Sequence, residues 1–141
     1  MKHEPVRILL VEDNIADVYL FRKALAKAGL DAELTLIEDG GRAIAFVRGE
    51  GEYAGSPVPA LAVLDLSLPR QDGVKVLEAM RATERFVNVP VVIMSSSSFP
   101  PAHLQPERLR VARYIMKPPD LDDFLQIGNV LKEILLPEPN R

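Results

Sequence analysis

The sequence has 141 residues, 48% of them hydrophobic, which is enough for one globular domain with a buried core and too short for two. It carries 17 basic and 20 acidic residues, a net charge of −3 and no long basic run, so it offers no electrostatic reason to bind nucleic acid. It has no cysteine, which excludes disulfides, thiolate nucleophiles and zinc sites with cysteine ligands. This composition fits a reducing cytosol, and we predict a cytoplasmic protein.

The N-terminal segment predicts neither a signal peptide nor a membrane span, because its apolar run ends at Glu12 and Asp13, and we expect no membrane partner. That run, Val6 to Val11, is short and rich in branched residues, which is typical of a strand buried on both faces. Asn14 can cap a helix over residues 15–29, whose apolar residues recur at helical spacing.

Strands and helices are expected to alternate along the rest of the chain. The prolines between residues 100 and 106 leave room only for a short helix over residues 106–110. The complete order predicts an α/β fold, a doubly wound five-stranded parallel sheet flanked by helices. The further strands are expected over residues 32–38, 60–65, 90–95 and 113–116, and the further helices over 40–49, 72–84 and 120–135.

Polar side chains follow the predicted strands at their carboxyl ends. They are Glu12 and Asp13 after the first strand, Asp65 in the third, Ser95 in the fourth and Lys117 after the fifth. Because functional sites in such sheets lie outside the carboxyl ends of the strands, we expect these side chains to meet. Carboxylates so close together repel one another, and a hard cation such as Mg²⁺ relieves that repulsion.

Together these groups provide what is needed to move a phosphoryl group onto a carboxylate. Asp65 can attack as the nucleophile. The metal and Lys117 can neutralise the phosphoryl oxygens, and Ser95 can donate a hydrogen bond to one of them. We therefore expect the charge at the end of the third strand to be tolerated because a metal and an ammonium lie beside it.

The chain resembles the receiver domain of two-component response regulators. The resemblance rests on VED at 11–13, LDLSLPRQDG at 64–73, PVVIMSS at 90–96 and YIMKP at 114–118. The stretches VEDNIADVYLFRKAL and DLSLPRQDG make it most similar to single-domain regulators paired with phytochrome-type histidine kinases. The resemblance implies a flavodoxin-like receiver fold over residues 6–136, with an N-terminal extension of residues 1–5 and a short tail of residues 137–141.

The resemblance also implies a set of metal ligands. Asp65 is the expected phosphoacceptor and binds Mg²⁺ directly, together with Asp13. Glu12 is expected to act mostly through a metal-bound water, and the backbone carbonyl of Ser67 is expected to be another ligand. Ser67 itself departs from the family pattern, because asparagine is commoner at that position.

The switch residues are likewise implied by the resemblance. Ser95, which replaces the commoner threonine, is the expected switch hydroxyl, and Tyr114 is the expected aromatic switch. On phosphorylation, Ser95 is expected to move toward the phosphoryl group and Tyr114 to move inward. Lys117 is expected to pair with the phosphoryl group, and its peptide bond to Pro118 is expected to be cis. Arg110 stands where many relatives have a glycine.

Three functions remain open from the sequence. The first is a phospho-switch that accepts a phosphoryl group on Asp65 from a sensor histidine kinase, with intrinsic phosphorylation and dephosphorylation chemistry but no metabolic reaction. The second is a metal-dependent hydrolase with an aspartyl-phosphate intermediate, which Ser67 disfavours because such enzymes usually need an acid there. The third is an interaction module without the chemistry, which the complete set of site residues disfavours.

For the phospho-switch we expect an output through protein contacts, because no room for an output domain follows residue 136. We also expect a two-fold homodimer through the short helix, the last strand and the last helix, since two-fold pairs are the commonest closed assembly.

Overall fold

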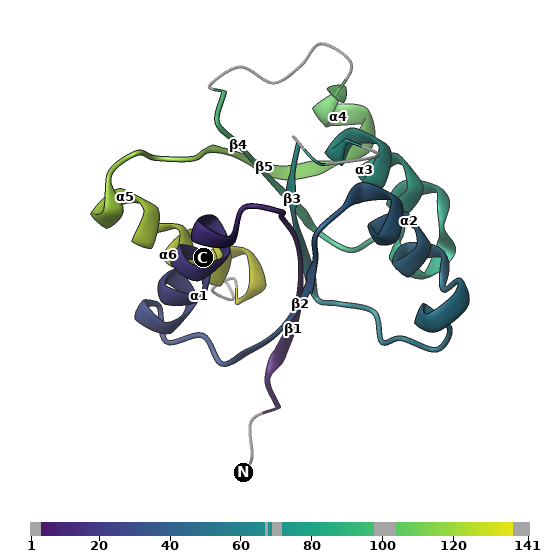
Figure 1. Ribbon diagram of the computed structural model, residues 1–141, viewed down its shortest axis with the longest axis horizontal. Helices are drawn as coiled ribbons and strands as arrows, with labels where there is room; N and C mark the ends of the chain where they lie inside the picture. The colour runs from purple at the N-terminus through teal and green to yellow at the C-terminus, as the bar shows by residue number, and fades with distance from the viewer. Residues whose placement is uncertain (1–3, 67, 69–71, 98–103, 137–141) are drawn as a thin grey trace, which may run out of the picture.

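The computed structural model describes residues 4–66, 68, 72–97 and 104–136. Its strands form one sheet that stands between two layers of helices (Figure 1). The elements are β1 (Val6–Val11), α1 (Ile15–Lys27), β2 (Ala32–Ile37), α2 (Gly40–Arg48), η1 (Gly51–Tyr53), β3 (Leu61–Asp65), α3 (Gly73–Ala82), η2 (Glu84–Phe86), β4 (Val91–Ser95), α4 (Pro106–Leu109), β5 (Val111–Met116), α5 (Leu121–Leu125) and α6 (Ile127–Leu135).

The sheet has the order β2-β1-β3-β4-β5, and every neighbouring pair is parallel. The predicted doubly wound five-stranded fold is therefore confirmed. The chain winds from β1 outward to β2 and then returns to β3 on the other side of β1. This reversal makes the crevice beyond the carboxyl ends of β1 and β3 the topological switch point, where such sheets place their functional site.

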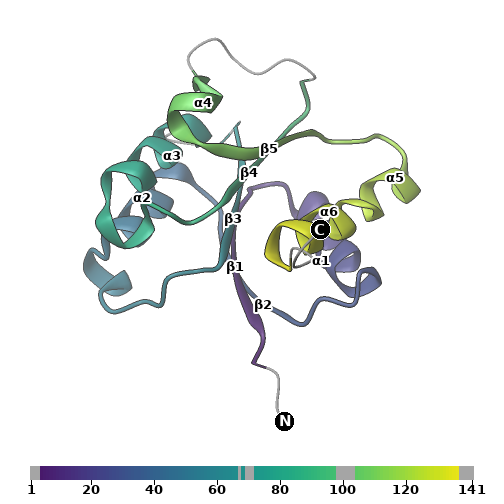
Figure 2. The same cartoon turned by 180° about the vertical axis from the view of Figure 1, so that it is seen from behind.

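Helices cover both faces of the sheet, with α1, α5 and α6 on one face and α2, α3 and α4 on the other (Figures 1 and 2). Alternate residues of each strand point to opposite faces of the sheet and pack in two separate hydrophobic cores. In β1, Leu9 packs in the core that contains Phe46 of α2, whereas Ile8 packs in the core that contains Phe21 of α1. The central strands β3 and β4 are buried along their whole length, as their continuous apolar runs predict.

The last helix was predicted as one segment, but the structure divides it at Gln126 into α5 and α6. The local cause is tighter hydrogen bonding, because Gln126 N–H donates to the Asp123 carbonyl and Asn129 N–H to the Gln126 carbonyl, both three residues apart. Helix α6 then lies so close to α1 that a Cβ at Gly128 would be 2.1 Å from the Ala24 carbonyl oxygen.

The α4 segment is as short as its prolines predict, and it ends one residue early. Arg110 adopts a left-handed conformation with φ of 57°, which stops the helix at Leu109 and lets β5 begin at Val111, two residues before the predicted start. Glycine is the residue that adopts this conformation at least cost, so Arg110 carries backbone strain that a glycine would avoid. No helix within the described ranges is long and apolar enough to cross a membrane.

Candidate functional site

The structure brings the predicted site residues together at the switch point. Glu12 and Asp65 are almost completely buried, with 3% and 6% of their surfaces exposed, whereas Asp13 is exposed. One carboxylate oxygen from each of these three residues lies within 4.8 Å of the others. We call Glu12, Asp13 and Asp65 the carboxylate edge.

Lys117 places its ammonium against this edge from the segment that follows β5. Its Nζ lies 2.9 Å from Glu12 Oε1, 3.3 Å from Asp65 Oδ2 and 2.8 Å from Asp17 Oδ2. The lysine side chain is only 12% exposed. Because an ammonium has three N–H donors, each of the three carboxylates can accept one of them.

The pKa values of both Glu12 and Lys117 are raised in this site. The shift favours the neutral form of the acid and the charged form of the lysine. Burial raises the pKa of Glu12 to about 7; Asp65 adds to that rise, and the hydrogen bond from Lys117 opposes it. For Lys117, burial disfavours the ammonium, but hydrogen bonds to Asp17 and Glu12 outweigh that cost and raise its pKa above the usual range. The lysine is therefore a permanent cation in a site with excess negative charge.

The turn into α3 explains why a glycine follows Asp72. A Cβ at Gly73 would stand 2.4 Å from the main-chain oxygen of Asp65, so only glycine fits there without moving the chain. Gly73 N–H donates to the Leu66 carbonyl, and the Asp72 carboxylate caps α3 by accepting from Lys75 N–H. The start of α3 thus holds the backbone of Asp65 in place.

The two predicted switch residues meet through the segment beyond β4. Ser95 is 7% exposed, and its Oγ accepts a hydrogen bond from Ser97 N–H at 3.1 Å. The Tyr114 hydroxyl donates to the Ser97 carbonyl oxygen at 2.9 Å. Lys117 N–H donates to the Ser95 carbonyl at 2.7 Å, so the main chains of the serine and the lysine are directly connected.

The donor set fits a hard divalent cation. Its three carboxylates offer oxygen ligands within one small region, and their charges exceed what a single ammonium can neutralise. The expected carbonyl ligand from Ser67 lies outside the described residues. Asp13, Asp65 and Glu12 are the residues that would hold the ion.

One expectation is wrong: the described residues contain no cis peptide bond, so the bond between Lys117 and Pro118 is trans. The trans form is the lower in free energy even before proline, so a local sequence pattern does not require the cis form.

Sequence reasoning missed Asp17. It lies in the first turn of α1, where Asn14 caps the helix by accepting from Ala16 N–H and Asp17 N–H. Its position was the available signal, because Asp17 lies in the first turn of the helix that begins two residues after Asp13. That position puts Asp17 at the same end of α1 as the carboxylate edge.

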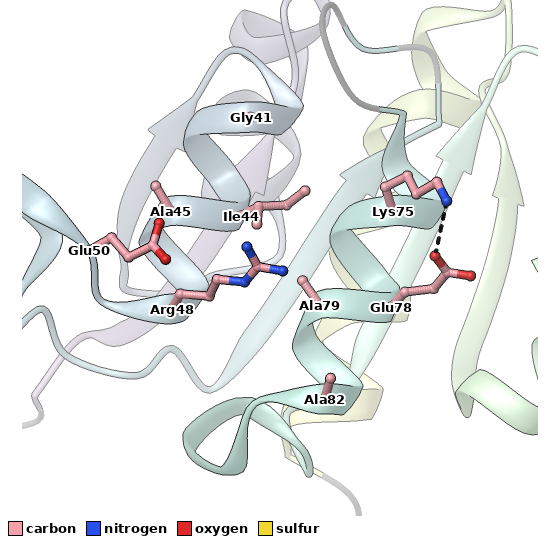
Figure 3. A pocket seen from close by; sticks show the side chains of 9 residues that line it. All are labelled: Gly41, Ile44, Ala45, Arg48, Glu50, Lys75, Glu78, Ala79 and Ala82. Carbon is pink, nitrogen blue, oxygen red and sulfur yellow. Dashed lines mark ion pairs between the residues drawn. The ribbon is translucent and has the colours of Figure 1, made fainter.

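A groove between α2 and α3, of about 610 Å³, is a second concave feature (Figure 3). Its charged side chains include Lys75 and Glu78, which pair with each other at 3.7 Å (Figure 3). Arg48 and Glu50 line its other wall. Its acids and bases lie on exposed helix surfaces, so its chemistry is much less distinctive than that of the buried carboxylate edge.

Comparisons with known proteins identify the family. Residues 8–128 match the model of the response regulator receiver domain. Response regulator Rcp1 of Synechocystis sp. is 37% identical over 123 residues, which cover 87% of this chain and 84% of the relative. A crystal structure of the phosphorylated cyanobacterial phytochrome response regulator RcpA superposes with a TM-score of 0.85 at 36% identity, over 95% of this chain and 96% of that one.

A crystal structure of the Mn²⁺-bound form of response regulator Rcp1 gives a TM-score of 0.83 at 34% identity, over 96% of this chain and 98% of the other. The match to the family model spans most of the chain, and the fold agrees with these neighbours along nearly its full length. The chain therefore belongs to the family of response regulator receiver domains.

Proposed function

We propose that this receiver domain works as a phospho-switch in which Asp65 accepts the phosphoryl group in a Mg²⁺-dependent reaction. The observation that carries the proposal is the position of Asp65. It ends the fully buried strand β3, shares the carboxylate edge with Glu12 and Asp13, and lies 3.3 Å from the Lys117 ammonium. The core encloses Asp65 on its other sides, so a phosphoryl donor can reach this carboxylate only from the carboxyl end of the sheet.

In the transfer, an Asp65 carboxylate oxygen attacks phosphorus, the bond from phosphorus to the donor breaks, and the donor leaves with that electron pair. A divalent cation held by Asp13 and Asp65 would supply positive charge to the phosphoryl oxygens. Lys117 stays protonated and donates an N–H to one of these oxygens, and the Ser95 hydroxyl donates to another. Hydrolysis of the aspartyl phosphate by water resets the switch, so the domain provides its own phosphorylation and dephosphorylation chemistry.

The partner that we propose as phosphoryl donor is a sensor histidine kinase of the phytochrome type. The support is the similarity to Rcp1 and to the phytochrome response regulator RcpA. Two apolar side chains of α1 are exposed beside the site, Ile15 at 84% and Tyr19 at 60%, and they suit a protein contact there. We propose a cytoplasmic location for this function, because the ATP that phosphorylates such kinases is found there.

We also propose that the phosphorylated domain signals through protein contacts, including a two-fold homodimer that uses α4, β5 and α5. Met116 and Leu121 are large apolar residues on this face, 45% and 55% exposed. Sedimentation with and without beryllofluoride, a phosphoryl mimic, tests the dimer. A monomer in both states at high concentration would refute it.

The central experiment measures the intact mass after incubation with acetyl phosphate. We expect one added phosphoryl group with Mg²⁺ and none in excess chelator. Asp65→Asn should abolish the addition, whereas Asp72→Asn, which changes a neighbouring carboxylate that caps α3, should retain it. Labelling of Asp65→Asn at the wild-type level would overturn the assignment.

The same measurement separates the other two functions. Steady release of inorganic phosphate without a stable adduct would favour an aspartyl-phosphate hydrolase. No reaction with acetyl phosphate or with a phosphorylated kinase would favour an interaction module that lacks the chemistry. The stability of the adduct is therefore recorded together with phosphate release.

A further inference from the structure

The Lys117 ammonium makes its shortest contact with a residue outside the carboxylate edge. Asp17 Oδ2 lies 2.8 Å from Nζ, compared with 2.9 Å for Glu12 and 3.3 Å for Asp65. The Asp17 side chain is 22% exposed and the lysine side chain 12%. This ion pair is therefore better shielded from solvent than a typical surface pair, which contributes little.

We propose that Asp17 is a positioning residue that holds the Lys117 ammonium at the phosphoacceptor. The inference rests on the proposed function of Asp65. Asp17 does not belong to the cluster of carboxylate oxygens that could hold a metal, which consists of Glu12, Asp13 and Asp65. Asp17 acts through Lys117, which is the only site residue with which it forms a described ion pair.

Lys117 needs such a restraint because its side chain is a flexible four-carbon stem with a freely rotating ammonium. The bond from Lys117 N–H to the Ser95 carbonyl fixes the main chain but not the ammonium. Asp17, in contrast, is fixed by its helix. Asn14 caps the first turn of α1, and Val18, the next residue, is buried in the core.

The three acidic partners accept different N–H groups of the Lys117 ammonium. Glu12, directly after β1, and Asp17, in α1, accept two of these N–H groups at 2.9 and 2.8 Å. The third N–H group therefore points toward Asp65. A phosphoryl group on Asp65 places new oxygens on that third side. Lys117 can then donate to a phosphoryl oxygen while Asp17 and Glu12 keep it in place, and it neither loses its proton nor leaves its anchors.

The test has two independent measurements on the whole chain. The first is the rate of phosphorylation by acetyl phosphate with Mg²⁺. We expect Asp17→Ala to lower this rate about tenfold, because a misplaced group makes a weaker contact with the transferring phosphoryl group. Asp17→Glu should recover part of the loss, since it restores a carboxylate that can reach the ammonium.

The second measurement is the ammonium signal of Lys117 in heteronuclear NMR, without metal and without a phosphoryl donor. A held ammonium exchanges its protons slowly and gives a resolved signal, which Asp17→Ala should abolish or broaden. Asp122→Asn is the matched control, because it also removes an acid from the first turn of a helix. It should change neither the rate nor the signal.

Several outcomes would overturn the proposal. An unchanged rate in Asp17→Ala means that Lys117 does not depend on Asp17 during transfer. A faster rate means that Asp17 withdraws the lysine from the phosphoryl group. A slower rate with an intact ammonium signal points to a general structural effect. If wild type takes up no phosphoryl group, the proposed function fails, and the NMR comparison alone decides whether Asp17 holds Lys117.

Discussion

Two regions of the molecule bury charge beside the sheet, and they do so in opposite ways. At the carboxylate edge, several acids share one ammonium, so negative charge is in excess. At the other region, the Arg81 guanidinium donates to five main-chain carbonyl oxygens, three of which share the two N–H groups of Nη1. Its acceptors are Phe86, Val87, Val89, Leu109 and Arg110, at 2.8 to 3.4 Å.

We call Arg81 with these carbonyls the arginine clamp, which ties the segment before β4 to the turn between α4 and β5. Burial, and secondarily Arg110, lowers the pKa of Arg81, but a guanidinium remains charged at all ordinary pH values. The clamp is complete within the protein, whereas the carboxylate edge needs a cation to balance it. A charge whose partners all lie within the protein indicates a structural role, and unbalanced charge indicates a binding role.

The largest effect is expected from breaking the clamp. Arg81→Met removes a charged donor that serves five main-chain carbonyls, most of them part-buried, and leaves them without that partner. We expect the free energy of unfolding to fall by about 3 kcal/mol. Urea denaturation measures the loss, and phosphorylation of the protein that stays folded should continue.

Arg85→Met is the matched control for the clamp. Arg85 donates one hydrogen bond, to the Ser56 carbonyl, and its guanidinium lies 5.6 Å from the centre of the Phe86 ring. Its replacement should cost less than about 1 kcal/mol. Equal losses in the two variants would show that the clamp is no more than an ordinary surface contact.

A methyl group at Gly73 tests how tightly packing and chemistry are coupled at the carboxylate edge. Gly73→Ala would push against the Asp65 main-chain oxygen, and we expect a loss of about 2 kcal/mol together with slower phosphorylation. Gly128→Ala creates a similar clash, against Ala24 in α1, away from Asp65. It should lose stability with phosphorylation unchanged, and an equal slowing in both variants would argue against local coupling.

Removing one acid from the carboxylate edge should stabilise the metal-free protein. Glu12→Gln relieves repulsion while Lys117 keeps Asp17 and Asp65 as partners, so we expect a gain of about 1 kcal/mol without metal. The stabilisation that Mg²⁺ gives to wild type should shrink in this variant. Thermal unfolding in chelator and in Mg²⁺ measures both changes. A less stable variant in chelator would mean that Lys117 depends on Glu12 more than the acids repel one another.

The difference between the two regions also explains what the sequence could predict. Buried apolar runs such as Val6 to Val11 predict strands from local sequence alone. The parallel topology then brings Asp65 and Lys117 to the carboxyl end of the sheet. Arg81 carries no local signal, because its acceptors are backbone carbonyls as far as 29 residues away, and any residue type supplies a carbonyl. The break at Gln126 escaped prediction since it depends on how the chain packs, and α5 and α6 together keep one apolar period.

Within the site, the sequence correctly placed the acids and Lys117 at strand ends that meet, but it missed Asp17 on a helix. The geometry of parallel strands fixes where strand ends meet, whereas Asp17 reaches Lys117 only because α1 packs beside the segment after β5. Its position in the first turn of the helix that follows Glu12 and Asp13 was a usable signal.

The smallest effect is expected at Tyr114, where the two regions meet. Its strand, β5, starts at the arginine clamp, and its hydroxyl donates to the Ser97 carbonyl beyond the carboxylate edge. Tyr114→Phe removes a solvent-exposed hydrogen bond from a half-buried side chain, so we expect a loss of only about 0.5 kcal/mol. Because that bond holds the ring in its present orientation, its removal should favour the inward orientation expected of the phosphorylated state. Beryllofluoride should therefore bind more tightly to Tyr114→Phe than to wild type, as titration calorimetry can measure. Weaker binding would mean that the hydroxyl supports the activated state, and equal binding would mean that Tyr114 does not report phosphorylation.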